Sequence, residues 1–348
     1  MSPLSDLGAF GNIAAFLIAS AIVWYAGDRL ARAADAIAKH TSIGHAFIGV
    51  VLLGVVVSLP EMTFAAVAAA RGSAELAVNG LLGGIGMSMV VVAITDFVTV
   101  REPLSSDVER PVVMLQGAMV ALMLTLAAAG ITAGDIPVPG TGVGVWTSLL
   151  IALYVISVYL VRHLEPYRPW SPDHPQRNQV EPVEQTAEEH ARALPPLVTK
   201  AVVAAAAVVS ATTVLAFSAE LLAEQTGLGA SYVGFLFGGL VTTLPELSTM
   251  LSSARIREFD MAFSDAFGTN LCSTGLIFLA DAFYCGGPVL SEVGSFALFG
   301  VLVGNALTCI YLVGLVTRSR RTLFGIGLDS FAVLVTAAGG FAILYYLR

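Results

Sequence analysis

The chain has 348 residues, of which 56% are hydrophobic and 12% are charged, with a formal net charge of −8 and a mean hydropathy of +0.82. Soluble domains carry about a quarter charged residues, so this composition excludes an ordinary soluble protein. It predicts a polytopic membrane protein, with the lipid bilayer as a partner and no nucleic-acid partner.

Ten stretches are apolar and long enough to cross about 30 Å of hydrocarbon as helices. They cover residues 9–27, 43–70, 74–97, 112–130, 144–162, 198–222, 229–254, 261–283, 293–316 and 324–347. The first stretch is too long for the apolar part of a signal peptide, so we expect it to remain as the first helix. The sequence therefore predicts an all-α polytopic membrane protein with ten transmembrane helices.

Lysine and arginine are distributed unevenly among the predicted loops. With the N-terminus outside, 15 of the 17 basic residues fall in inner loops, and only Arg71 and Arg348 lie outside. Such a bias is typical of cytoplasmic loops. We expect a multi-pass protein of the plasma (inner) membrane with an external N-terminus. The sequence leaves the oligomeric state open, and a monomer is compatible with it.

The only long polar segment divides the helices five and five. We therefore expect a first five-helix repeat over 1–162, a cytoplasmic linker over 163–197 and a second five-helix repeat over 198–348. The linker is rich in Pro, Glu and Gln and is too short for an autonomous domain. We expect a disordered tether, with a regulatory or partner-binding element as the alternative.

The two halves repeat the same pattern at a constant offset of 185 residues. Residues 41–61 align with 226–246, so that Glu61 matches Glu246, and the register continues to Asp96 and Asp281. Glycines, a proline and acids matching in one register indicate an internal repeat. Because each repeat has an odd number of spans, the second must enter the membrane inverted. Inverted repeats are typical of secondary transporters with a site near the midplane.

Each repeat interrupts an apolar helix with a proline at the same position. Pro60 cannot donate an N–H to the carbonyl of Val56, and Pro245 cannot donate one to Val241. Carbonyls freed inside a membrane are tolerated only where protein, water or an ion satisfies them. The backbone oxygens of Val56 and Val241 are therefore candidate ligands.

A glutamate follows each of these prolines. A carboxylate near mid-membrane costs about 2.5 to 3.5 kcal/mol, and no Lys, Arg or His lies in the interior of a predicted span to pair with Glu61 or Glu246. The compensating charge must be a proton or a bound cation, unless the carboxyls pack as neutral groups. Carboxylates beside carbonyls are hard ligands that suit Ca²⁺ or Na⁺.

Neutral and acidic oxygen donors stand near the glutamates in the sequence. They are Ser58, Thr242 and Thr243 before the glutamates, and Ser88, Asp265, Thr269, Asn270 and Ser273 in the helices that follow. For any single Ser or Thr, the alternative is a hydrogen bond to a carbonyl of its own helix.

The strings "SLPE" and "TLPE", each followed by a glycine-rich helix, and "GTN" in the second half resemble the two alpha-repeats of the cation/calcium exchanger superfamily, particularly its sodium/calcium branch. The resemblance covers nearly the whole chain. It implies antiport of Ca²⁺ against Na⁺, with no cofactor, through one site shared by the repeats. The implied ligands are Glu61 and Glu246, with hydroxyls from Ser58, Thr242, Thr243 and Thr269.

The chain departs from that family's pattern in ways that affect the counter-ion. Val57 and Gly84 stand where the family has hydroxyl residues, and Ser88 and Ser273 stand where it commonly has Asn or Asp. We therefore expect Ca²⁺/Na⁺ exchange, with H⁺/Ca²⁺ antiport or transport of another cation as alternatives.

An intramembrane enzyme is a further alternative, which the sequence disfavours. A membrane metalloprotease needs His-Glu-x-x-His on a helix, and none of the five histidines lies in the interior of a predicted span. An aspartyl mechanism needs paired aspartates, whereas Asp96 and Asp281 are expected at opposite faces, each ending its helix.

Overall fold

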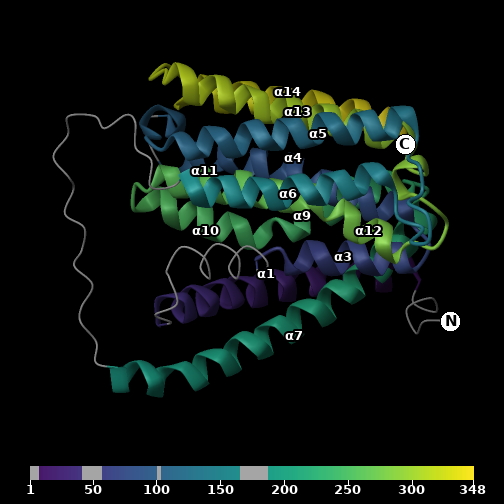
Figure 1. The fold of residues 1–348 in the computed structure, drawn as a ribbon, viewed down its shortest axis with the longest axis horizontal. Helices are drawn as coiled ribbons and strands as arrows, with labels where there is room; N and C mark the ends of the chain where they lie inside the picture. Colours follow the sequence, from purple (N-terminus) through teal and green to yellow (C-terminus); the bar gives the residue numbers. More distant parts are fainter. Residues whose placement is uncertain (1–7, 41–56, 100–102, 165–186) are drawn as a thin grey trace.

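The computed structural model describes four ranges of the chain: 8–40, 57–99, 103–164 and 187–348. Val56, a predicted carbonyl ligand, and residues 165–186, most of the predicted linker, lie outside these ranges. The described chain forms one elongated bundle of helices (Figure 1).

The described part of the first half is helical, and one short 3-10 turn follows its third helix. Its elements are α1 (Ala9–His40), α3 (Leu59–Ala70), α4 (Ala74–Thr99), η1 (Leu104–Asp107), α5 (Pro111–Ala133) and α6 (Val145–Leu164). α5 begins at a proline, which lacks only an N–H that a first helical turn leaves unbonded.

The second half has the same order, with two interrupted helices. Its elements are α7 (Ala187–Thr226), α8 (Ala230–Val233), the π-helical turn η2 (Gly234–Gly238), α9 (Gly239–Thr242), α10 (Leu244–Arg255), α11 (Phe259–Gly275), α12 (Ile277–Phe283), η3 (Val289–Ser291), α13 (Gly294–Thr317) and α14 (Leu328–Leu347). A two-stranded antiparallel hairpin of β1 (Thr322–Leu323) and β2 (Ile326–Gly327) connects α13 to α14.

The helices match the predicted membrane spans. Within the described ranges, eight helices are long and apolar enough to cross a membrane, and the bent pair Ala230–Thr242 and Leu244–Arg255 makes a ninth when counted as one span. The predicted span 43–70 is described only from Val57, where α3 occupies its end. The all-α polytopic membrane fold is confirmed, and the tenth span depends on residues outside the described ranges.

Burial differs sharply between central and peripheral helices. The apolar window of α4 is 78% buried within the protein, and that of α6 is only 17% buried. Since α4 is enclosed on nearly all sides, small residues such as Gly80 and Gly83 line its contacts with neighbouring helices. α4 therefore forms the centre of the bundle, and α6 leaves most of its apolar surface for lipid.

Corresponding helices of the two halves run in opposite directions. α1 and α7 lie side by side along one edge of the bundle (Figure 1). Asn12, near the start of α1, donates from Nδ2 to Oε1 of Gln225, near the end of α7, at 3.1 Å. Further along, Leu30 packs with Val208. The antiparallel pairing is the arrangement that an inverted repeat requires.

Asp96 closes the end of α4. Its Oδ1 accepts a hydrogen bond from the backbone N–H of Leu104 at 3.0 Å, and its Oδ2 accepts one from the N–H of Gly327 at 2.8 Å. Gly327 belongs to the other half and immediately precedes α14. Asp96 therefore connects the loop after its own helix to the opposite repeat.

Asp281 does the same in the second half. Its Oδ1 accepts from the N–H of Val289 at 2.7 Å, and its Oδ2 accepts from the N–H of Gly144, just before α6, at 2.7 Å. Asp281 lies near the end of α12, as Asp96 does in α4. The two aspartates are thus structural residues at helix ends, as expected, and form a reciprocal pair of connections between the repeats.

Candidate functional site

The Leu-Pro-Glu motif of each half begins a helix. Pro60 lies in the first turn of α3 and Pro245 in the first turn of α10, where a missing N–H costs nothing. α10 is bent by 44° from the helical segment before it. The motif therefore places Glu61 and Glu246 in the first turns of two half-helices, where the helix dipole favours negative charge.

The two carboxyl groups are brought together inside the protein. Glu61 is 2% exposed and Glu246 is 1% exposed, and the two side chains interact electrostatically. Within the described ranges, none of their four carboxyl oxygens has a hydrogen-bond partner, and no ion pair joins them to a Lys, Arg or His. Buried carboxylates without partners are very costly, so this pair requires a positive charge that the described residues do not supply.

Hydroxyl groups from both halves face these carboxyls. The Thr242 side chain faces Glu61, and the side chains of Ser88 and Thr269 face Glu246. The Ser88 hydroxyl is buried and has no hydrogen-bond partner among the described residues. The space between the helices therefore contains oxygens that remain free to bind a cation.

Asn270 lies where α4 and α11 meet. Its Nδ2 lies 3.5 Å from the carbonyl oxygen of Ile85, and its Oδ1 is buried without a donor. The repeat offset of 185 pairs Ile85 with Asn270, so this contact lies close to the pseudo-two-fold axis. Oδ1 of Asn270 is a further free acceptor near the centre of the bundle.

The two threonines before Glu246 bond back to their own helix. The Thr242 hydroxyl donates to the Gly239 carbonyl at 3.3 Å, and the Thr243 hydroxyl contacts the carbonyls of Gly239 and Leu240 at 3.1 and 3.0 Å. Donating the proton in this way leaves the oxygen lone pairs available. Both residues can therefore still contribute to a cation site.

The other predicted ligands lie around this centre with different surroundings. The carbonyl of Val241 accepts a backbone N–H at the Thr243 cap, so one of its lone pairs is used. Ser273 is fully buried in α11, and Ser58, also buried, contacts Cys272. The predicted carbonyl of Val56 lies outside the described residues.

A cavity of about 480 Å³ reaches the site from one end of the bundle. We call this cavity the vestibule. Its lining includes the following polar side chains: Asp28, Arg32, Ser58, Gln116, Tyr154, Ser248, Thr249, Ser252, Ser253, Asp265, Thr269 and Cys272. They come from α1, α5, α6, α10 and α11 and from Ser58 just before α3, and the vestibule opens where α10 ends and α11 begins.

Several vestibule residues were not predicted as site residues. Thr249 follows Glu246 by three positions, so helical spacing could have placed both on one face. Gln116 and Tyr154 come from α5 and α6, which carry no motif. Only the packing of the helices brings them to the vestibule.

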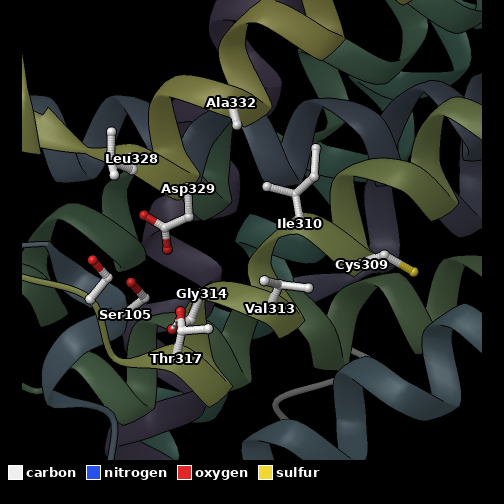
Figure 2. Close-up of a pocket in the computed structure, with 10 residues that line it drawn as sticks. Ser105, Cys309, Ile310, Val313, Gly314, Thr317, Leu328, Asp329 and Ala332 are labelled. Atoms are coloured by element: carbon white, nitrogen blue, oxygen red, sulfur yellow. Dashed lines mark hydrogen bonds between the residues drawn. The ribbon is translucent and has the colours of Figure 1, made fainter. Parts of the chain in front are cut away.

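A second cavity, of about 410 Å³, lies between α13 and α14. Figure 2 shows the Asp329 carboxyl on its wall, on the side of Ser105 and Thr317. Most of the remaining lining is apolar, and none of the predicted site residues lines it. This cavity is therefore separate from the glutamate pair.

Among the described residues, no group of three or more His, Cys, Asp or Glu side chains is arranged to hold a metal ion. The candidate site differs from such a cluster in composition. It combines two carboxylates, Glu61 and Glu246, with hydroxyl and amide oxygens, a donor set that suits hard cations.

Comparison with known proteins identifies a family. The family model described as sodium/calcium exchanger protein matches residues 11–162 and 198–347, which together include both repeats and omit the predicted linker. No curated protein sequence matches the chain.

Solved structures with the same fold have low sequence identity to this chain. The H⁺/Ca²⁺ exchanger CAX is similar with a TM-score of 0.68 at 14% identity, covering 97% of this chain and 86% of that one. YfkE gives 0.66 at 12% identity, covering 95% and 92%. The sodium-calcium exchanger NCX_Mj gives 0.60 at 15% identity, covering 95% and 98%. At these identities the similarity shows a shared fold.

Proposed function

This chain belongs to the sodium/calcium exchanger protein family, and we propose that it is a secondary-active antiporter that exchanges Ca²⁺ for Na⁺. The observation that carries the proposal is the buried pair of Glu61 and Glu246, whose four carboxyl oxygens accept no hydrogen bond from the described residues. Each half contributes one carboxylate, so neither repeat can form the site alone. A transporter rather than an enzyme is the function that such a site supports.

The charge of the pair fits the proposed exchange. Two carboxylates balance one Ca²⁺, two Na⁺ or two protons, so binding one kind of ion leaves no charge for the other. Ca²⁺ takes six to eight oxygens, and Ser88, Thr269 and Asn270 offer neutral oxygens beside the glutamates. Competition for the same carboxylates would couple the two fluxes.

Access from one end supports exchange by alternating access. The vestibule reaches Ser58 and Thr269 from the end where α10 meets α11. In the inverted repeat, the equivalent route from the other end is formed by α3 and α4. We propose that the protein alternates between two states, in which one route or the other is open, and that the bound ion crosses the membrane in this change.

Sodium is the counter-ion that we favour. The hydroxyls of Ser58, Thr242 and Thr243 stand at the positions before the glutamates where hydroxyls would serve sodium. Against this, Val57 and Gly84 remove two hydroxyls from the first half. That loss favours the second candidate, H⁺/Ca²⁺ antiport, in which the glutamates themselves carry the protons. Another cation on the same scaffold is the remaining alternative.

The orientation in the membrane follows from the basic residues. Arg32, Arg110 and Arg255 lie at the vestibule end, at or near the ends of α1, α5 and α10, whereas Arg71 pairs with Glu220 near the opposite end. We propose that the vestibule end is cytoplasmic in a plasma (inner) membrane. We further propose repeats over 1–162 and 198–348, joined by a cytoplasmic linker.

The test is calcium uptake into proteoliposomes with either a sodium gradient or a pH gradient imposed. Ca²⁺/Na⁺ exchange predicts uptake that requires sodium inside the vesicle and is lost when choline replaces it. Full uptake without sodium under a proton gradient would support H⁺/Ca²⁺ antiport instead. No calcium flux under either gradient would refute calcium antiport.

A further inference from the structure

Two carboxylates line the vestibule: that of Asp28, which pairs with Arg32, and that of Asp265 in the middle of α11. The Thr249 hydroxyl donates to its Oδ2 at 2.5 Å, which fixes the side chain against α10. Asp265 also interacts electrostatically with Glu246. No ion pair joins it to a described basic residue. A negative group therefore stands on the open route between solvent and the glutamate pair.

The same pair of positions is apolar in the other half. The offset of 185 residues places Phe64 opposite Thr249 and Gly80 opposite Asp265. Phe64 is 1% exposed, and a Cβ atom on Gly80 would lie 2.5 Å from its ring carbon Cε1. The two pairs therefore make equivalent contacts in the two halves, one polar and acidic, the other a ring packed on a glycine.

Two neighbouring positions in the vestibule wall are also polar in the second half and apolar in the first. Ser252 and Ser253 line the vestibule, and the offset places them opposite Val67 and Ala68 in α3. At these positions the route through α10 and α11 is more polar than its counterpart through α3 and α4, whereas Thr63 and Asn79 keep the polar character of their vestibule counterparts Ser248 and Ser264. The asymmetry lies in the sequence itself and does not depend on which route is open.

We propose that Asp265, positioned by Thr249, binds the cation on its way between the vestibule and the glutamate pair, and that it does so from the vestibule side only. This inference rests on the proposed cation transport. The carboxylate would raise the local cation concentration at the entrance to the site and hold the ion before it reaches Glu246. Entry from the opposite side, past Phe64 and Gly80, lacks this step.

The contacts of Asp265 argue against a purely structural role. It lies inside α11, where the helix satisfies the backbone, so it caps neither end. Its hydrogen bond accepts the Thr249 proton, and an amide oxygen in Asp265→Asn could accept the same proton. The variant therefore removes the charge and can keep the contact.

The experiment measures calcium transport by Asp265→Asn from each side separately, in inside-out and right-side-out membrane vesicles. We expect the half-saturating calcium concentration on the vestibule side to rise about tenfold, since one unit charge a few ångströms from a divalent ion is lost. The value on the opposite side should stay unchanged. Thr249→Val should give a smaller shift on the same side.

Two variants control for charge and folding. Asp107→Asn removes a carboxylate at the same end of the bundle, in η1, outside the vestibule, and should leave both values unchanged. Asp265→Glu keeps the charge and should restore most of the wild-type value on the vestibule side.

The outcomes separate the inference from the proposed function. Wild-type vesicles without calcium transport would refute the function itself. With wild-type transport intact, an unchanged Asp265→Asn protein would overturn the inference. Equal losses on both sides would also overturn it, because Asp265 would then belong to the shared central site.

Discussion

A Cβ atom on Gly83 would lie 1.8 Å from the carbonyl oxygen of Phe235. α4 therefore crosses the π-helical turn η2 with its backbone in direct contact. One turn further, a Cβ atom on Gly239 would lie 2.3 Å from the carbonyl carbon of Gly83. Because α9 leads directly into α10, this crossing fixes the distance between α4 and the start of the helix that carries Glu246.

Gly83→Ala should destabilise the protein. The added methyl group meets backbone rather than a side chain that can rotate away, so we expect a loss at or above the usual 1–3 kcal/mol for overpacking. Thermal unfolding of the purified protein in detergent measures it. Gly339→Ala is the matched control, because nothing lies within 4 Å of a Cβ atom there. Equal unfolding temperatures for the two variants would contradict the backbone contact.

Glu61→Gln and Glu246→Gln should each abolish calcium transport and leave the protein folded. The amide keeps the volume of the carboxyl group and loses the charge that offsets the desolvation of Ca²⁺. Calcium uptake into proteoliposomes measures the loss, and thermal unfolding measures folding. Glu224→Gln, on the exposed side of α7, should transport normally. Full flux in either buried variant would remove the main support for the site.

Thr243→Val should raise the sodium concentration that exchange requires and change the pH dependence little. The side chain keeps its shape, but the oxygen that we assign to a sodium site is lost. The measurement is calcium uptake as a function of sodium at several pH values. An unchanged sodium dependence would exclude Thr243 as a sodium ligand.

Asp96→Asn and Asp281→Asn should each lower stability. Each carboxylate accepts two backbone N–H groups, one through each oxygen. An amide would turn its NH₂ toward one of these donors, at a cost of about 1–3 kcal/mol. Thermal unfolding compares both variants with Asp107→Asn, whose ion pair with Arg320 is exposed and weak. An unfolding temperature no lower than that of Asp107→Asn, in either variant, would contradict this role.

Most of the fold could be predicted from the sequence. Apolar length identified the spans, and the odd number of spans in each half predicted the inversion that the antiparallel α1 and α7 display. Interruptions were harder to locate. The π-helical turn Gly234–Gly238 and the break between α11 and α12 at Leu276 follow no proline. They depend on how these helices pack against α4 and α6.

The centre of the candidate site was more predictable than its surroundings. A buried charge has few tolerable positions, so Glu61 and Glu246 stood out in an apolar sequence. The walls of the vestibule come from five helices and the residues just before α3, and their polar residues are ordinary at the level of sequence. Asp265 was visible as an acid, but its contact with Thr249 and its apolar counterpart at Gly80 needed the structure.

The reciprocal aspartates make the first repeat depend on parts of the chain that are made much later. Asp96 accepts a hydrogen bond from Gly327, which follows it by 231 residues. Asp281 accepts one from Gly144, which precedes it by 137 residues. During synthesis the first repeat therefore enters the membrane with an acceptor still unpaired at the end of α4. The segment that leads into the last helix completes the first repeat as well as its own, so a chain truncated before Gly327 should leave Asp96 without one of its two backbone donors.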